Sequence, residues 1–167
     1  DLDRFKSIND TMGHASGDDL LVATAGRLVS VVEPNDLVAR LGGDEFAIIQ
    51  RVIRDPMHEA RTLAERLLEM MSNGVALNGL NLIVGTSIGI ACAPLHGTAA
   101  SDLLKNADLA LYRAKATGRG SFKFFQDGMD MAVQDQHALE LDLRLALQRQ
   151  EFEVHYQAII DLSTMET

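Results

Sequence analysis

Residues 36–49 read DLVARLGGDEFAII, with two apolar segments on either side of a glycine-rich stretch. Short apolar segments run from Asp36 to Leu41 and from Phe46 to Ile49, which is typical of strands. The four residues between them, Gly42-Gly43-Asp44-Glu45, have the composition of a tight turn, because glycine adopts the backbone angles that such turns require. We therefore predict an antiparallel hairpin with two carboxylates at its turn.

The spacing of apolar residues predicts helices on both sides of this hairpin. One helix has its apolar face between Leu20 and Val32 and ends before Pro34. A second follows Asp55-Pro56 and runs to about Met71. A third begins with an N-cap at Ser101 and ends at Gly118.

The remaining extended segments complete an α+β fold. We interpret Asp1-Leu2-Asp3 as the tail of a strand whose earlier residues are absent. Further strands are predicted at Val75–Leu77, at Asn81–Ala91 across a turn at Asn78-Gly79, and at Ser121–Phe125. The order β-α-β-β-α-β-α-β, with a truncated first strand, predicts a sheet with an antiparallel hairpin and packed helices. Ferredoxin-like folds and the palm domains of nucleotide polymerases are built in this way.

Charge and composition exclude some classes of function. The net charge of −9 argues against sequence-independent binding of nucleic acid, which relies on Lys and Arg. No apolar run approaches the ~20 residues of a membrane-spanning helix, so we expect no membrane contact by this chain. Residues 1–125 carry 13 bases and 15 acids, whereas residues 126–167 carry 2 bases and 9 acids. This shift predicts a domain boundary near Gln126.

The single cysteine, Cys92, stands in an apolar run and is expected to be buried and inert. A lone thiol fits a reducing cytoplasm. The sequence does not begin with methionine, and we interpret it as part of a longer parent protein with room for a membrane anchor upstream.

Acidic residues occur at two positions of the predicted fold, the end of a strand and the turn of the hairpin. Asp1 and Asp3 lie at the end of a strand, and Asp44 and Glu45 lie in the hairpin turn. If the two strands are neighbours, these groups converge into a site for Mg²⁺ or Mn²⁺, which take oxygen ligands and act on phosphates. The adjacent Gly42-Gly43 lets a phosphate approach the backbone closely. On spacing alone, a solvated acidic turn explains the pattern slightly better.

Basic and polar side chains elsewhere suggest a nucleotide ligand. Lys6, Lys115 and Arg119 are candidates to hold a triphosphate, although basic residues in a last helical turn also stabilise the helix dipole. Asn9 and Asp18 are candidates to bind guanine, since a carboxylate accepts hydrogen bonds from its N1–H and 2-amino groups. Taken alone, each of these two is better explained as a helix cap or a polar loop residue.

Several motifs occur in order over residues 1–125. They read DLDRFKSIND at 1–10, GH at 13–14, GD at 17–18, LGGDEF at 41–46, and AD, ALY, AK and GR between 107 and 119. Together they resemble the GGDEF domain of diguanylate cyclases. One such motif is weak, but this set at this spacing is highly specific.

The resemblance implies a reaction, its partners and its residues. Two GTP molecules are condensed into cyclic di-GMP with release of pyrophosphate, and two GGDEF domains meet as a homodimer, each holding one GTP. The implied metal ligands are Asp1, the Leu2 carbonyl and Asp44; the catalytic carboxylates are Asp44 and Glu45; the guanine contacts are Asn9 and Asp18; and the phosphate contacts are Lys6, Lys115 and Arg119 with the backbone of Phe5, Lys6, Gly42 and Gly43.

One departure from the family concerns product binding. Many cyclases carry an Arg-x-x-Asp site for the product shortly before the Gly-Gly turn, whereas the matching stretch here is Glu33-Pro34-Asn35-Asp36. Because Glu33 should repel a product phosphate, we expect weak or no feedback inhibition through this stretch.

The acidic tail carries a second resemblance. Residues 126–167 are interpreted as a linker followed by the first helix, about Met131 to Gln150, and the first strand, Phe152 to Ile160, of an incomplete EAL phosphodiesterase domain. The similarity rests on Leu139-Glu140 and on HYQAIID at 155–161, and a generic amphipathic helix is the alternative. With an EAL domain attached in the parent, a second function stays open, that of a silent GTP-binding module that regulates the phosphodiesterase.

Overall fold

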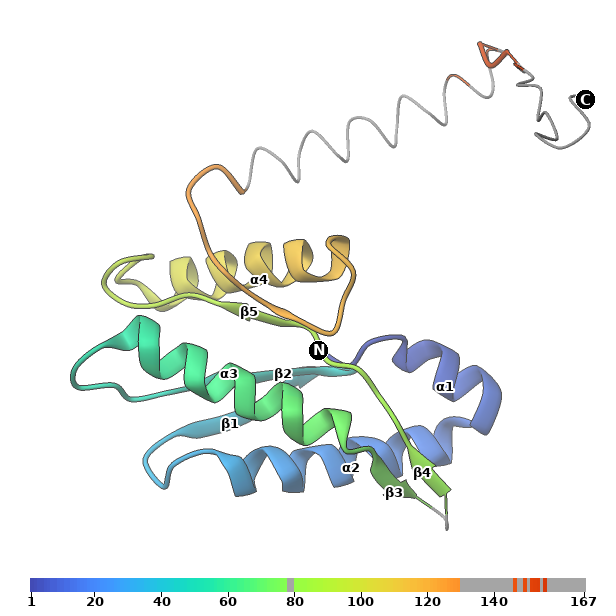
Figure 1. Cartoon of the computed structure of the whole chain (residues 1–167), viewed down its shortest axis with the longest axis horizontal. Helices are drawn as coiled ribbons and strands as arrows, with labels where there is room; N and C mark the ends of the chain where they lie inside the picture. Colours follow the sequence, from blue (N-terminus) through green and yellow to red (C-terminus); the bar gives the residue numbers. More distant parts are fainter. Residues whose placement is uncertain (78–79, 130–145, 147–148, 150, 154, 156–167) are drawn as a thin grey trace, which may run out of the picture. The chain divides into compact units, whose positions relative to one another are not determined.

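The computed structural model describes residues 1–77, 80–129, 146, 149, 151–153 and 155 (Figure 1). By its internal contacts the chain divides into two units, Asp1–Asp130 and Met131–Thr167, and the helices and strands below belong to the first. The helix predicted over 131–150 lies largely outside the described residues. Of the strand predicted over 152–160, residues 152, 153 and 155 are described and are not in a strand, since no described strand pairs with them.

Two helices follow Asp1–Asp3 and form a helical hairpin. Helix α1 spans Phe5–Met12, helix α2 spans His14–Val31, and Gly13 between them has a φ of 83°. A left-handed backbone of this kind suits glycine. The sequence-based prediction covers α2 from Leu20 and misses α1, because an eight-residue helix with few apolar residues gives little periodic signal.

The predicted hairpin is confirmed. Strand β1, Leu37–Gly42, pairs antiparallel with β2, Glu45–Ile49, from Leu37 opposite Ile49 to Gly42 opposite Glu45. An irregularity between Arg40 and Gly42 precedes the turn. The strands include Gly42 and Glu45, so the turn itself consists of Gly43 and Asp44.

The long strand predicted over 81–91 is wrong as one element. Strand β4, Leu80–Leu82, pairs antiparallel with β3, Val75–Leu77, as predicted. Strand β5, Ile88–Ile90, pairs parallel with β6, Phe122–Phe124, and between β4 and β5 Thr86 forms an isolated antiparallel bridge with Leu2. Residues 80–90 pair first with β3, then with Leu2 and then with β6, so this extended segment forms separate short strands.

Helix α3 spans Pro56–Ser72 and helix α4 spans Ala100–Ala116. The Asp55 side chain caps α3 by accepting a hydrogen bond from the His58 N–H at 3.1 Å. The predicted N-cap of α4 at Ser101 is wrong: the N–H groups of Asp102 and Leu103 both donate to the Ala99 carbonyl, so Ala99 is the cap and the helix starts earlier.

Two apolar clusters hold this unit together. The first joins the helical hairpin to the extended segments and consists of Leu2, Phe5, Leu20, Leu21, Met71, Val75 and Val84. The second lies between α2 and α3 and consists of Leu28, Leu63 and Leu67. Because Leu2 is only 2% exposed, it fixes its neighbours Asp1 and Asp3 against the core.

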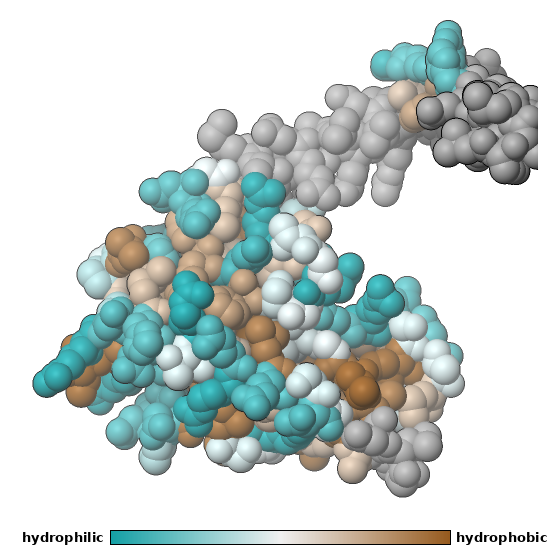
Figure 2. Space-filling view, viewed as in Figure 1, coloured by the Kyte–Doolittle hydropathy of each residue, from teal (hydrophilic) through white to brown (hydrophobic). Residues whose placement is uncertain are grey.

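Helix α4 packs on β5 at Gly89, where an added Cβ would overlap the backbone of Ala107 and Leu111 (Figure 1). Hydrophilic residues cover much of the face in Figure 2, with apolar residues reaching the surface between them. None of the described helices is long and apolar enough to span a membrane. The elements confirm the predicted α+β class with an antiparallel hairpin and packed helices.

Candidate functional site

The segment Asp1–Asp3 lies between the hairpin turn and the extended residues before β5. The Leu2 N–H donates to the Asp44 carbonyl at 3.3 Å, and the Asp3 N–H donates to the Gly85 carbonyl at 2.9 Å. The Asp1 carbonyl accepts hydrogen bonds from the Ser87 N–H at 3.1 Å and the Thr86 hydroxyl at 2.8 Å. The two acidic positions that the sequence singles out are therefore neighbours in space.

The carboxylate of Asp1 is paired with a lysine from α4. Lys115 Nζ lies 2.8 Å from Asp1 Oδ2, and the Asp1 side chain is 5% exposed. The carboxylates of Asp44, Asp3 and Glu45 lie within electrostatic reach of Asp1.

The sequence prediction misses one acidic neighbour of this group. Burial, and then the charge of Glu45, raise the pKa of Asp108 on α4. Asp108 precedes Lys115 by seven residues, which is two helical turns, so both lie on one face of α4. The seven-residue spacing from Lys115 is the feature of the sequence that could have placed Asp108 beside the other carboxylates.

The donor set suits Mg²⁺ held jointly with a nucleotide. Within the described residues no group of three or more His, Cys, Asp or Glu side chains is arranged to hold a metal ion. Mg²⁺ usually takes one or two carboxylates and completes its octahedron with water and substrate phosphates. Asp1 and half-buried Asp44 can supply the carboxylates.

Asp3, which the sequence groups with Asp1, has a different environment. Its Oδ1 accepts a hydrogen bond from the Ser87 hydroxyl at 2.7 Å, and its Oδ2 accepts one from the Gly120 N–H at 3.0 Å. Both oxygens are thus used inside the protein. Asp3 fastens the loop after α4 to the segment that precedes α1.

The helical hairpin brings Asn9 and Asp18 together. Asn9 lies against Gly17, where an added Cβ would overlap its side-chain oxygen, and Asp18 is the next residue along α2. The Asn9 oxygen is buried and has no hydrogen-bond partner among the described residues, whereas Asp18 is exposed. A buried acceptor without a partner is costly, so this position suits a ligand that donates a hydrogen bond.

Two of the predicted phosphate contacts, Phe5 and Lys6, lie in the first turn of α1. The Phe5 side chain is buried in the core, so only its backbone can face a ligand, and Lys6 is exposed. No atom lies within 4 Å of an added Cβ at Gly42 or Gly43, which leaves open space in front of both. Only Gly43 has a positive φ, 51°, so the left-handed backbone is used at one of the two glycines.

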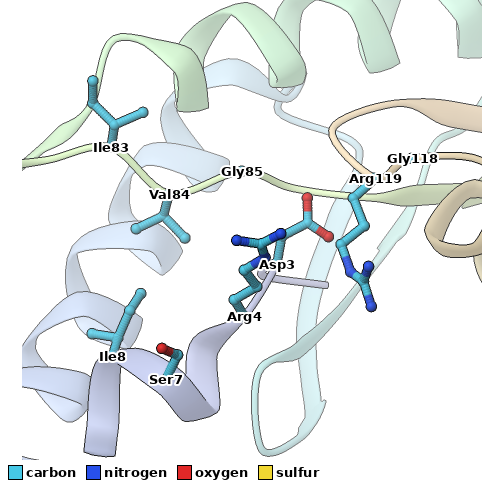
Figure 3. A pocket seen from close by; sticks show the side chains of 9 residues that line it. All are labelled: Asp3, Arg4, Ser7, Ile8, Ile83, Val84, Gly85, Gly118 and Arg119. Atoms are coloured by element: carbon cyan, nitrogen blue, oxygen red, sulfur yellow. The ribbon is translucent and has the colours of Figure 1, made fainter. Parts of the chain in front are cut away.

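Arg119 lies on a cleft of about 420 Å³ beside Asp3 (Figure 3). It has a φ of 62°, and its N–H donates to the Ala114 carbonyl at 3.1 Å. The cleft is lined by Asp3, Arg4, Ser7, Ile8, Ile83, Val84, Gly85, Gly118 and Arg119. Arg4, which the sequence prediction leaves without a role, shares this cleft.

Comparison with known proteins identifies the family. A family model described as the GGDEF domain of diguanylate cyclases matches residues 1–121. The cyclic di-GMP phosphodiesterase NbdA of Pseudomonas aeruginosa is 41% identical over 163 residues, which are 98% of this chain and 21% of NbdA. The bifunctional diguanylate cyclase/cyclic di-GMP phosphodiesterase MucR of the same organism is 42% identical over 157 residues, which are 94% of this chain and 23% of MucR.

A solved structure of the GGDEF domain of PA1120 (TpbB or YfiN) from Pseudomonas aeruginosa superposes with a TM-score of 0.77. It is 38% identical, and the match covers 80% of this chain and 78% of that one. This similarity confirms the predicted fold class. The chain spans about a fifth of the length of the curated relatives that it matches. With the family match over residues 1–121, the chain belongs to the GGDEF family of diguanylate cyclase domains.

Proposed function

We propose that this chain is a diguanylate cyclase domain that binds one GTP and condenses it with the GTP of a second copy into cyclic di-GMP, releasing two pyrophosphates. The observation that carries the proposal is the hydrogen bond between the Leu2 N–H and the Asp44 carbonyl. It brings the backbone of Asp44 next to Leu2, which supports a shared site for Asp1, the Leu2 carbonyl and Asp44, with Lys115 in contact with Asp1.

We assign Asp1, the Leu2 carbonyl and Asp44 as ligands of Mg²⁺ or Mn²⁺, with Asp44 and Glu45 as the catalytic carboxylates. When bound, the ion supplies charge neutralisation at phosphate and a lowered pKa for an attacking hydroxyl. Asp44 and the exposed Glu45 stand at the open side of the hairpin turn, where they can orient and deprotonate the 3′-hydroxyl of GTP.

We assign guanine recognition to Asn9 and Asp18. The Asp18 carboxylate suits the paired donors N1–H and 2-amino, which adenine lacks. The buried Asn9 oxygen supports this assignment, because it gains a hydrogen-bond partner when a base enters. The helical hairpin brings the two residues that the sequence suggests close together, which supports the assignment.

We assign the triphosphate to the start of α1 and to three cations. Helix α1 has no side-chain N-cap and no acidic residue in its first turn, so its positive dipole end favours an anion, while the N–H groups of Phe5 and Ser7 already donate to the Leu2 and Arg4 carbonyls. Lys6, Lys115 and Arg119 supply positive charge, and Gly42-Gly43 leaves room for a phosphate. Positioning and charge neutralisation dominate the catalysis of phosphoryl and nucleotidyl transfer.

A second function is supported by the relatives. NbdA is named as a cyclic di-GMP phosphodiesterase and MucR as a bifunctional enzyme. The alternative is therefore a catalytically silent GTP-binding module that regulates an attached EAL domain, for which residues 126–167 would be the linker and the beginning. A cytoplasmic location suits both functions, and the buried free thiol of Cys92 agrees with a reducing compartment.

Product inhibition is expected to be weak in either case. The two carboxylate oxygens of Asp36 accept hydrogen bonds from the N–H groups of Glu33 and Arg51, each at 3.0 Å. Asp36 is thus engaged in the turn that precedes β1. Both oxygens of its carboxylate already accept a hydrogen bond within the chain, which adds to the repulsion of a product phosphate expected from Glu33.

One assay separates the two functions. The chain is incubated with GTP and Mg²⁺, and cyclic di-GMP and pyrophosphate are quantified by chromatography. Formation of both products supports the cyclase. GTP binding without turnover supports the regulatory module, and the absence of GTP binding contradicts both.

A further inference from the structure

The cleft in Figure 3 is lined by a positively charged side chain, that of Arg4, which has no role in the proposed site. Arg4 and Arg119 line its polar side with Ser7, and the two guanidinium groups extend on either side of Asp3. Both arginines are exposed, and neither side chain forms a hydrogen bond or an ion pair with another residue in the described part of the chain. Their charges are available to an anion.

Asp3 links the two backbone segments that carry the arginines. Its Oδ2 accepts a hydrogen bond from the Gly120 N–H at 3.0 Å. Arg4 follows Asp3 in the chain and Arg119 precedes Gly120, so this one partly buried hydrogen bond links the backbone segments that carry the two arginines. The other oxygen, Oδ1, accepts a hydrogen bond from the Ser87 hydroxyl, and in the described part of the chain the carboxylate forms no ion pair with either guanidinium group.

The backbone at both arginines is in the left-handed region, with φ of 59° at Arg4 and 62° at Arg119. Residues other than glycine stay in this region only where the surrounding structure holds them, and such residues cluster at ligand sites. The Arg4 carbonyl accepts the N–H of Ser7 at 2.9 Å and of Ile8 at 3.4 Å. Arg4 is thus the N-cap of α1, and its charge adds to the positive end of the helix dipole.

We propose that Arg4 is a second guanidinium contact for the terminal phosphate of GTP, paired with Arg119 across the cleft. The inference rests on the proposed function, which places the triphosphate between α1 and Arg119. A guanidinium group binds phosphate through two parallel charge-assisted hydrogen bonds. Because GDP lacks the terminal phosphate, Arg4 is a specificity-determining residue that distinguishes GTP from GDP.

Titration calorimetry with GTP and with GDP, in Mg²⁺, tests this on the 167-residue chain. Arg4→Gln removes the charge at similar length, Arg4→Lys keeps the charge without the planar fork, and Arg54→Gln is the matched control at an exposed arginine outside the cleft. We expect Arg4→Gln to raise the Kd for GTP about 10-fold and to change the Kd for GDP less than about twofold. The Kd of Arg4→Lys for GTP should lie between those of the parent chain and Arg4→Gln. The Kd of Arg54→Gln should match that of the parent chain.

An unchanged Kd for GTP in Arg4→Gln, or equal weakening of GTP and GDP, overturns the inference, as does a parent chain that binds no GTP. Circular dichroism establishes that the variants are folded. If Arg4→Gln does not fold, the decision rests on Arg4→Lys, in which an unchanged ratio of the two affinities overturns the inference. Binding is independent of turnover, so a chain that binds GTP through Arg4 but forms no product contradicts the cyclase alone.

Discussion

At the scale of single residues, the proposed guanine site depends on an atom without an internal partner. The Asn9 side-chain oxygen is buried against Gly17 and accepts no hydrogen bond from the described residues. Because Gly17 has no side chain, it leaves room for the Asn9 amide. A side chain at position 17 would displace that amide while leaving every proposed contact residue in the sequence.

Gly17→Ala is expected to raise the Kd for GTP about 10-fold, which corresponds to the loss of one hydrogen bond to the ligand. The matched control is Gly26→Ala on the same helix, where an added Cβ meets no atom within 4 Å. The control should leave GTP affinity unchanged and raise the free energy of unfolding by up to about 1 kcal/mol. Equal affinities of the two variants in calorimetry contradict the role of Asn9.

The raised pKa of Asp108 predicts how the stability of the fold depends on pH. Its pKa is raised by burial and then by Glu45, so the ionised carboxylate destabilises the folded state. Protonation removes this cost, which is present at neutral pH and vanishes below the ordinary pKa of 3.8. Asp108→Asn should therefore raise the thermal midpoint by roughly 1 °C at pH 7 and by less at pH 4. A gain that grows on acidification contradicts this account.

The sequence does not distinguish residues of one type whose roles depend on partners far away in the chain. Asp1 and Asp3 are the same residue type two positions apart, and both were predicted to converge with the turn. Asp3 is instead bound by Ser87 and Gly120, which are 84 and 117 residues away in the chain. Such contacts leave no local pattern, and neither does the partial desolvation that raises the pKa of Asp108.

At the scale of elements, the sequence predicts what local chemistry determines. The hairpin of β1 and β2 is confirmed because the Gly-Gly turn and its apolar flanks lie in one short stretch. The strand predicted over 81–91 is wrong as one piece because its pairing passes from β3 to Leu2 and then to β6. Long-range pairing of this kind is set by the whole fold and not by propensity.

The contact between α4 and β5 gives an element-scale prediction. An alanine at Gly89 would overlap the backbone of Ala107 and Leu111, so Gly89→Ala should lower the free energy of unfolding by about 1–3 kcal/mol. Denaturation with urea measures this, with Gly26→Ala again as the control. Equal stability of the parent chain and Gly89→Ala would show that α4 does not rest on β5 at this position.

At the scale of the whole molecule, the proposed chemistry needs two copies, since one domain holds one GTP. Product formed per molecule should therefore rise with chain concentration until the dimer is saturated, because each turnover needs an encounter of two loaded domains. Binding of GTP should not depend on chain concentration. Constant specific activity at concentrations where light scattering shows only monomers contradicts the two-copy mechanism.

Cyclic di-GMP formation by Asp44→Asn, compared with that by Asp10→Asn, tests whether the hairpin turn carries the metal and nucleotide site. Asp10 is an exposed aspartate on α1 outside the carboxylate group, and Asp44 is joined to Leu2 through its carbonyl. We predict that Asp44→Asn lowers turnover at least about 100-fold, because several kcal/mol of charge stabilisation are lost, and that Asp10→Asn keeps the parent rate. Retention of most of the turnover by Asp44→Asn would contradict the assignment of the Asp1 and Asp44 pair as the metal and nucleotide site.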